Sequence, residues 1–103
     1  MTTRRDSSFD DYLAEALKDP VEAAAYVEAA LELEDTNALL VALRHVARAH
    51  GMTDVAQRAE LGEKTLFRAL GKDGNPTLAT MQKLLHAMGL RLSVAPSHEV
   101  EAV

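Results

Sequence analysis

The strongest hydrophobic pattern in this chain lies between residues 36 and 50. Apolar side chains recur there at the spacing of one helix face: Leu39, Leu40, Leu43, Val46 and Ala47. Asp35 suits the start of such a helix and Gly51 suits its end, because these residue types favour those positions. We therefore predict a helix from Thr36 to His50 and expect it to be the central support of the fold.

Two more helices are predicted before this one. The first begins with Ser8 as its N-cap, while residues 1–6 are polar and expected to fray. Its apolar stripe consists of Phe9, Leu13, Ala16 and Leu17, with Tyr12 at the edge. The second begins at Asp19 and Pro20, a cap followed by a residue that fits the first helical position, and runs to about Leu33.

The segment from residue 52 to residue 70 has the pattern of two short helices joined by a tight turn. Thr53 is the expected N-cap of the first helix. The turn follows as Glu60-Leu61-Gly62, where the glycine permits backbone geometry that a larger residue would resist. In the second helix Leu66, Ala69 and Leu70 can be buried, which turns these polar side chains outward: Glu63, Lys64, Thr65 and Arg68. The pattern is typical of a DNA-binding helix-turn-helix, although helical bundles without DNA contacts also contain such pairs.

The last part of the chain adds one helix and one expected strand. A turn-rich loop over residues 71–76 is followed by Thr77 as an N-cap and by a helix over residues 78–88, whose apolar face is Leu78, Met81, Leu84, Leu85 and Met88. Leu90, Leu92 and Val94 then alternate with polar residues, which predicts a short strand. A lone strand is unstable, so we expect it to pair with a symmetry mate or with a partner protein. Residues 96–103 are expected to be a disordered tail.

The 103 residues form a single expected domain: a helical extension over residues 8–35, a core over residues 36–95 and the tail. The net charge of −5 is uneven, because residues 1–51 carry −5, residues 52–95 carry +2 and the tail carries −2. This asymmetry favours two partners of opposite charge, one polyanionic and one basic. No apolar run is long enough for a membrane span or a signal peptide, so we expect no membrane association.

Several kinds of chemistry are excluded or disfavoured. The chain has no cysteine, which excludes disulfides and thiolate metal sites and fits a reducing cytoplasm. The four histidines show no metal-ligand spacing, and no nucleophile is paired with a recognisable base. We therefore expect no cofactor, no metal site and no enzymatic activity.

The whole pattern resembles known DNA-binding proteins. From about Thr36 to Leu92 it resembles the lambda-repressor-like, or Xre/Cro-like, domain, in which the second and third helices of a small bundle form the helix-turn-helix. More narrowly, the chain resembles the addiction-module antidote (antitoxin) family over nearly its whole length. The segments that carry this resemblance are YLAEALKDPVEAAAYVEAALEL, ALRHVARAHGM, LGEKTLFRAL, GNPTL and LLHAMGLRL.

The resemblance implies the antitoxin of a type II toxin-antitoxin system. Such proteins neutralise a small toxin, typically of the RelE-like fold that acts on messenger RNA, and bind their own operator as homodimers to repress transcription. The chain departs from the wider helix-turn-helix pattern at two positions. Glu60 stands where glycine is common, and Gly62 stands where a Ser or Thr N-cap is usual.

The resemblance also assigns candidate DNA contacts. Residues placed to touch phosphates are Gln57, Lys72 and Asn75, whereas residues placed to read bases are Glu63, Lys64, Thr65 and Arg68. Phe67 is expected to pack against the N-terminal helices. The alternative is that these polar groups are ordinary solvated side chains.

A toxin-binding surface is expected on the N-terminal helices. Large apolar or aromatic side chains lie there on an acidic background: Phe9, Tyr12, Leu13, Leu17 and Tyr26. The alternative is that they close the core of a small domain. Two other functions stay open from the sequence, namely a free-standing Xre-like regulator without a toxin and a protein-interaction module without DNA binding.

Overall fold

The computed structural model describes residues 2–97, and it describes side chains from residue 9 onward. This part of the chain contains six helices, which confirms the all-α prediction. They are α1 (Thr2–Ala16), α2 (Pro20–Glu32), α3 (Thr36–His50), α4 (Met52–Arg58), α5 (Glu63–Leu70) and α6 (Leu78–Ala87).

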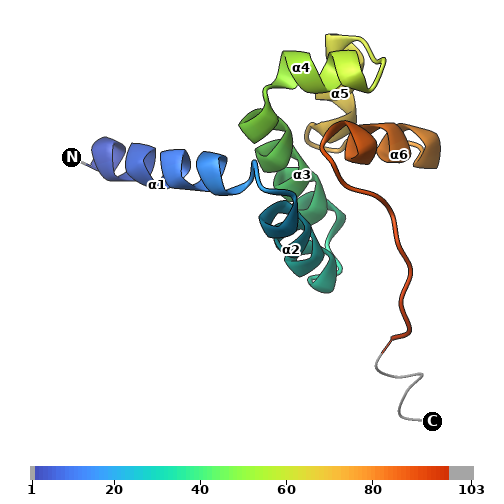
Figure 1. Cartoon of the computed structure of the whole chain (residues 1–103), viewed down its shortest axis with the longest axis horizontal. Coiled ribbons are helices and arrows are strands. Elements are labelled where there is room, and N and C mark those ends of the chain that lie inside the picture. Colours follow the sequence, from blue (N-terminus) through green and yellow to red (C-terminus); the bar gives the residue numbers. More distant parts are fainter. Residues whose placement is uncertain (1, 98–103) are drawn as a thin grey trace.

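Helix α3 is the centre of the arrangement, as predicted. It contacts α1, α2, α4 and α5, and α6 joins the bundle through α4. Figure 1 shows α2 running beside α3, the short helices α4, α5 and α6 gathered at the other side, and α1 extending away from the bundle. The molecule therefore has a compact helical body with one projecting N-terminal helix.

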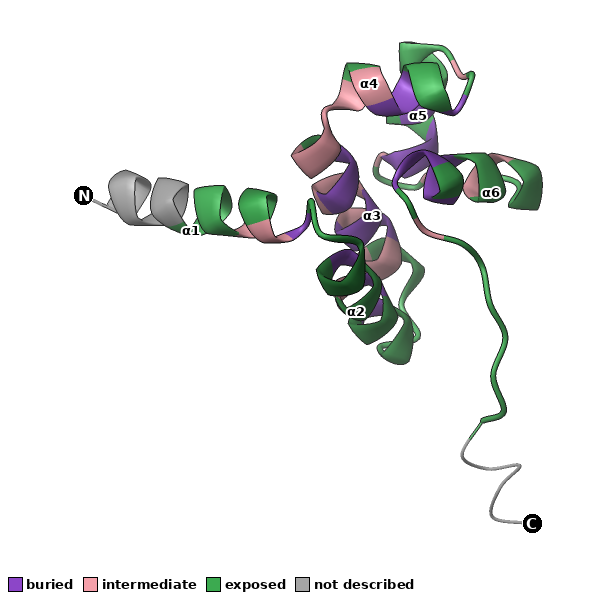
Figure 2. Ribbon diagram, in the orientation of Figure 1, coloured by how far each residue is buried: buried purple, intermediate pink, exposed green. Residues whose placement is uncertain are grey.

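The core is built from the predicted apolar faces. The largest side chains with almost no exposure come from the connection after α1 and from α3, α4, α5, α6 and its C-cap: Leu17, Leu43, Val46, Val55, Leu66, Leu70, Leu84 and Met88. No polar or charged side chain is buried in the part of the chain that the structure describes. Figure 2 shows the buried residues concentrated where α3 meets its neighbours.

Three predicted N-caps are confirmed by hydrogen bonds. The Asp19 side chain accepts from the backbone N–H of Val21 at 2.9 Å, and Asp35 accepts from that of Asn37 at 3.0 Å. Thr77 accepts from the backbone N–H of Thr80 at 3.1 Å. Each bond satisfies a donor that a helix start leaves without a partner, so these local signals fix where the helices begin.

Two predicted helix starts are wrong. Helix α1 begins at Thr2, so Ser8 lies inside the helix and residues 2–6 are helical. Helix α4 begins at Met52 after Gly51, whose positive φ of 96° both ends α3 and starts α4. Thr53 is therefore a helical residue, and its hydroxyl donates instead to Glu63 Oε2 at 3.1 Å.

The turn between α4 and α5 differs from the expectation at both of its notable positions. Gly62 has an ordinary extended backbone with φ −70°, whereas Glu60 has the left-handed φ of 58°. The N–H of Glu60 donates to the Gln57 carbonyl and the N–H of Leu61 donates to the Ala56 carbonyl. This pair of bonds is the Schellman motif, in which glycine usually holds the position that Glu60 holds here.

The C-terminal segment does not form a strand within the single chain. Gly89, with φ 78°, ends α6 in a second Schellman motif, in which the N–H of Leu90 donates to the Leu85 carbonyl at 2.7 Å. The segment from residue 91 to residue 97 is extended and has no regular secondary structure. Residues 98–103 of the predicted tail lie outside the described residues. Leu78, the first residue of α6, is predicted on its buried face but is 68% exposed, because no other helix covers it.

Candidate functional site

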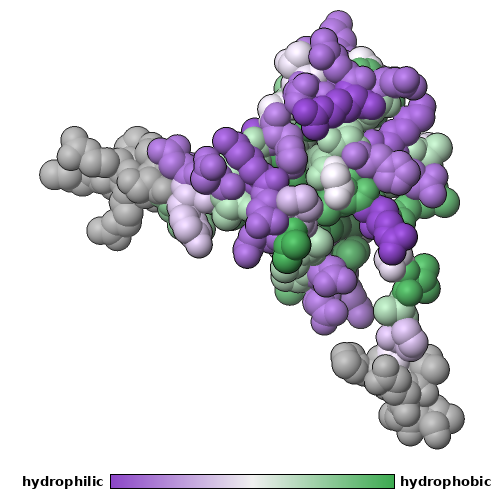
Figure 3. All heavy atoms as spheres, in the orientation of Figure 1, coloured by the Kyte–Doolittle hydropathy of each residue, from purple (hydrophilic) through white to green (hydrophobic). Residues whose placement is uncertain are grey.

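Helix α5 presents one polar face to solvent. Leu66, Ala69 and Leu70 are buried on the face that packs on the bundle, and this leaves the predicted set on the exposed side: Glu63, Lys64, Thr65 and Arg68. The division follows from the helical period, because apolar residues at i, i+3 and i+4 share one face. Figure 3 shows a largely hydrophilic surface over the part of the molecule where α4 and α5 lie.

The other predicted DNA contacts are also exposed. Gln57 lies near the end of α4, and Lys72 and Asn75 lie in the loop after α5. That loop passes close to the end of α5, since the N–H of Gly74 donates to the Gly71 carbonyl at 2.9 Å. A Cβ at Gly74 would overlap the carbonyl oxygen of Ala69, so glycine is required for this approach.

One hydrogen bond joins the starts of the two helices of this surface. The hydroxyl of Thr53, in the first turn of α4, donates to the carboxylate of Glu63, the first residue of α5. Gly62 gives α5 no side-chain cap, so the Glu63 carboxylate supplies the negative charge that a helix start favours. The sequence does not predict this hydrogen bond between Thr53 and Glu63, because its pattern favours Thr53 as the N-cap of its own helix.

The charges on this surface are balanced. Residues 52–73 carry four basic and four acidic side chains, and Arg58 forms an ion pair with Asp54 at 3.0 Å. Lys64, Arg68 and Lys72 take part in neither of the two ion pairs found among the described residues. These three cations are therefore the groups available to a polyanionic ligand.

Phe67 is the clearest functional candidate that the sequence interpretation missed. Its side chain is 52% exposed, so it does not pack against the N-terminal helices as expected. Residues three and four apart share a helix face, which puts Phe67 on the same face as Lys64 and Glu63. A signal for this was present, because the buried positions of α5 already account for its core face without Phe67.

The N-terminal helices form a second exposed surface. Phe9 is 62% exposed and Tyr12 is 71% exposed on α1, while Leu13 is half-buried. Leu17 lies in the core with 2% exposure, so of the two interpretations offered for it the structure favours core closure. Residues 9–35 carry nine acidic side chains and one lysine, and all of these are exposed.

Tyr26 links α2 to α3. Its hydroxyl oxygen lies 2.6 Å from Nδ1 of His45, and both side chains are half-buried. Burial lowers the pKa of His45 below 6.5, and the nearby Arg48 and Arg44 lower it further, against a smaller opposing effect of Asp10. When His45 is neutral with its proton on Nε2, its Nδ1 accepts a hydrogen bond from the Tyr26 hydroxyl, and this bond links α2 to α3.

Among the described residues, no group of three or more His, Asp or Glu side chains is placed to bind a metal ion. No helix among the described residues is long and apolar enough to cross a bilayer.

Comparison with known proteins gives the family. Residues 6–96 match the model of a family described as probable addiction module antidote protein. The chain belongs to this family. It is also 34% identical over 85 residues to an uncharacterized protein of Haemophilus influenzae, a match that covers 82% of this chain and 88% of that protein. No solved structure matches the chain.

The extent of the antidote-family match bears on the organisation of the chain. It begins within α1 and ends in the segment after α6. The projecting N-terminal helix, the α4–α5 pair and most of the C-terminal segment are thus all part of the pattern that defines the antidote family. The resemblance seen in the sequence covers the same three parts of the chain.

Proposed function

We propose that this chain is the antitoxin of a type II toxin-antitoxin system. In this proposal it neutralises a RelE-like toxin that cleaves messenger RNA, and it represses its own transcription as an operator-bound homodimer in the cytoplasm. The observation that carries the proposal is the antidote-family match over residues 6–96, because it spans both exposed surfaces described above. An antidote of this kind acts by binding and is not an enzyme.

The DNA half of the proposal assigns α4 and α5 to a helix-turn-helix. An eight-residue helix such as α5 is about 12 Å long and fits the width of the major groove. Lys64 and Arg68 would address guanine, Thr65 a thymine methyl group and Glu63 a cytosine amino group. Phosphate contacts fall to the surrounding exposed residues, which are Gln57, Lys72 and Asn75.

Phe67 joins the base-reading set in this proposal. Its exposed ring lies on the polar face of α5, where an aromatic side chain has no core to fill. Apolar contact with the methyl group of thymine is a known use of such a residue in the major groove. Phe67 would therefore contribute sequence preference without contributing charge.

The balanced charge of the surface sets the expected salt dependence. Lys72 is the one cation of each chain that the proposal places on a phosphate, and Lys64 and Arg68 read bases, so a dimer neutralises at least two and at most six phosphates. The affinity for operator DNA should then fall with salt along a log-log slope between about −2 and about −5. A slope near zero would favour the interaction module without DNA binding.

The DNA half is tested by Arg68→Ala. We expect it to weaken operator binding by about 5- to 150-fold, the range for one bidentate base contact, and to leave binding to unrelated DNA nearly unchanged. Lys18→Ala is the control, because Lys18 carries the same charge on the N-terminal part of the chain. Equal losses on operator and unrelated DNA would mean that Arg68 touches phosphate and does not read sequence.

The toxin half rests on the acidic surface of α1 and α2. An RNA-cleaving toxin is expected to be basic, and Phe9 and Tyr12 are exposed on a helix that also carries exposed carboxylates. Aromatic groups beside complementary charge are common anchors of protein interfaces. Leu13 and Tyr26, which are half-buried, would contribute less to the contact, and Leu17 would act only by holding α1 to the core.

The toxin surface is tested by co-purification with the protein encoded beside this chain. Tyr12→Ala combined with Phe9→Ala should weaken the complex at least about tenfold while leaving operator binding intact. Leu33→Ala is the matched control, because Leu33 is a comparably exposed side chain outside α1. Retention of full affinity by the double variant would move the toxin contact elsewhere, and absence of any complex would favour the free-standing regulator.

A further inference from the structure

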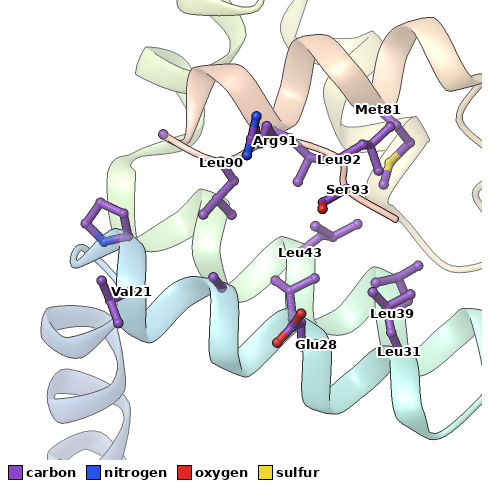
Figure 4. Close-up of a pocket in the computed structure, with 15 residues that line it drawn as sticks. Val21, Glu28, Leu31, Leu39, Leu43, Met81, Leu90, Arg91, Leu92 and Ser93 are labelled. Carbon is purple, nitrogen blue, oxygen red and sulfur yellow. The ribbon is translucent and has the colours of Figure 1, made fainter. Parts of the chain in front are cut away.

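An apolar groove lies between the two halves of the bundle. It has a volume of about 510 Å³ and is bounded by α2, α3, α6 and the segment that follows α6. Figure 4 shows its main side chains, with Leu31, Leu39 and Leu43 on one side and Met81, Leu90 and Leu92 on the other. Neither proposed contact surface uses these residues, so the groove needs a separate explanation.

Arg91, Leu92 and Ser93 form part of one wall of the groove and are not paired with a strand among the described residues. Residues 91–96 make no backbone hydrogen bond within the described chain, although they are extended. Leu92 is 44% exposed and Val94 is 97% exposed. An extended segment with free N–H and C=O groups and apolar side chains at every second position is a template for pairing with another strand. Figure 1 shows it leaving the bundle in isolation.

Charge argues for a second copy of this chain as the occupant. The groove is lined by one acidic residue, Glu28, and one basic residue, Arg91, whereas the strongly acidic surface lies on the exposed faces of the N-terminal helices. A basic toxin gains nothing from so balanced a lining. A two-fold dimer, in contrast, requires a surface that complements itself, and a groove with one charge of each sign meets that requirement.

The side-chain pattern also fixes a register. Antiparallel pairing of two copies about Leu92 would put Leu92 opposite its own counterpart and Leu90 opposite Val94. Arg91 would then face Ser93 and not another arginine, so no like charges meet. The apolar side of the paired segment would continue the apolar lining of the groove, because Leu90 and Leu92 already form part of it.

We propose that residues 90–94 of two copies pair antiparallel about Leu92 and that this pair closes the groove of each copy, forming the homodimer interface. The inference rests on the homodimer of the proposed function. It depends on neither DNA contact nor toxin contact, and it concerns residues that neither of those tests alters.

The absence of cysteine allows a direct test of the register. Leu92→Cys would be the only thiol in the chain. Residues directly opposite each other in an antiparallel pair have Cα atoms about 4.5–5.5 Å apart, which is within the range that a disulfide bridges. Mild oxidation of the purified full-length variant should therefore yield a cross-linked dimer. Leu33→Cys, an exposed site outside the groove, should stay monomeric on a denaturing gel.

The register predicts a second pattern. Leu90→Cys and Val94→Cys should cross-link poorly when each is oxidised alone, and should cross-link well when the two variants are mixed. In addition, Leu92→Asp should raise the dimer dissociation constant at least about tenfold in sedimentation experiments, because a charge replaces an apolar contact in each copy.

Three results would overturn the inference. The unaltered chain could be monomeric, Leu92→Cys could cross-link no better than Leu33→Cys, or Leu92→Asp could leave the dimer intact. The last two would assign the dimer interface to another face. Toxin and operator binding are measured in other assays, so failure of the cross-link or of Leu92→Asp would leave the proposed function standing, whereas a monomeric chain would also remove the homodimer from it. Loss of operator or toxin binding would leave the cross-link standing.

Discussion

The turn after α4 offers the sharpest test of the backbone description. Glu60 has a left-handed φ of 58° at the position of a Schellman motif that Gly89 occupies at the end of α6. Left-handed geometry costs a residue with a side chain roughly 1–2 kcal/mol, and glycine avoids this cost. Glycine also loses more backbone entropy on folding, which lowers the free energy of unfolding by about 0.5–1 kcal/mol. Glu60→Gly should therefore stabilise the fold by about 0.5–1 kcal/mol.

Gly89 and Gly62 provide matched comparisons. Gly89→Ala imposes a side chain on the left-handed position of the second motif, where the nearest neighbouring atom would be 3.9 Å away and no overlap arises. Gly89→Ala should lower the free energy of unfolding by about the amount by which Glu60→Gly raises it. Gly62→Ser should be neutral or stabilising by a few tenths of a kcal/mol, because Gly62 has an ordinary N-cap geometry and serine is a better cap.

The assay is equilibrium urea unfolding, with thermal unfolding as a second probe. For a chain of this size, Glu60→Gly should raise the melting temperature by about 2–8 °C. The sequence interpretation, in which Gly62 permits geometry that a larger residue would resist, predicts instead that Gly62→Ser destabilises the turn. A loss of about 1 kcal/mol in Gly62→Ser together with a loss in Glu60→Gly would refute the description of this turn.

Three further predictions concern stability. Gly74→Ala should destabilise the fold by about 1–3 kcal/mol, since its Cβ would overlap the Ala69 carbonyl, and an unchanged urea midpoint would contradict this. Leu43→Ala should cost about 2–5 kcal/mol because Leu43 is fully buried, whereas Leu78→Ala should stay within about 0.5 kcal/mol; equal urea midpoints for the two would be a failure. Because the pKa of His45 is lowered in the fold, its contribution is present above pH 6.5 and is lost as the pH falls through the lowered pKa. His45→Gln should flatten the unfolding free energy between about pH 7.5 and pH 5.5, and an unchanged slope would exclude His45 as the cause.

The sequence predicted most of the helices because their signals are local. Helix α3 has its apolar period, its Asp35 cap and its Gly51 stop within one stretch, and its predicted bounds are confirmed. The caps at Asp19 and Thr77 are confirmed for the same reason. The polar face of α5 also follows from the helical period alone.

Other features depend on which neighbour is present. Phe67 and Leu78 are exposed because no other helix covers them, and a helical period cannot reveal such a missing neighbour. The turn at Glu60 could be predicted only in part. The resemblance marks Glu60 as a position where glycine is common, but glycine tolerates left-handed geometry without requiring it, so the residue pattern alone favours Gly62. The expected strand has no partner among the described residues, and a strand forms only where a second strand supplies its hydrogen bonds.

The central claim is that this chain neutralises a toxin, and growth rescue tests it most directly. The protein encoded beside this chain is expressed alone and together with it, and bacterial growth is followed in both cases. The account predicts that the neighbour alone arrests growth, that co-expression restores it, and that Arg68→Ala still restores it because α5 is reserved for DNA. A harmless neighbour that forms no complex with this chain would contradict the claim and leave a transcriptional regulator without a toxin.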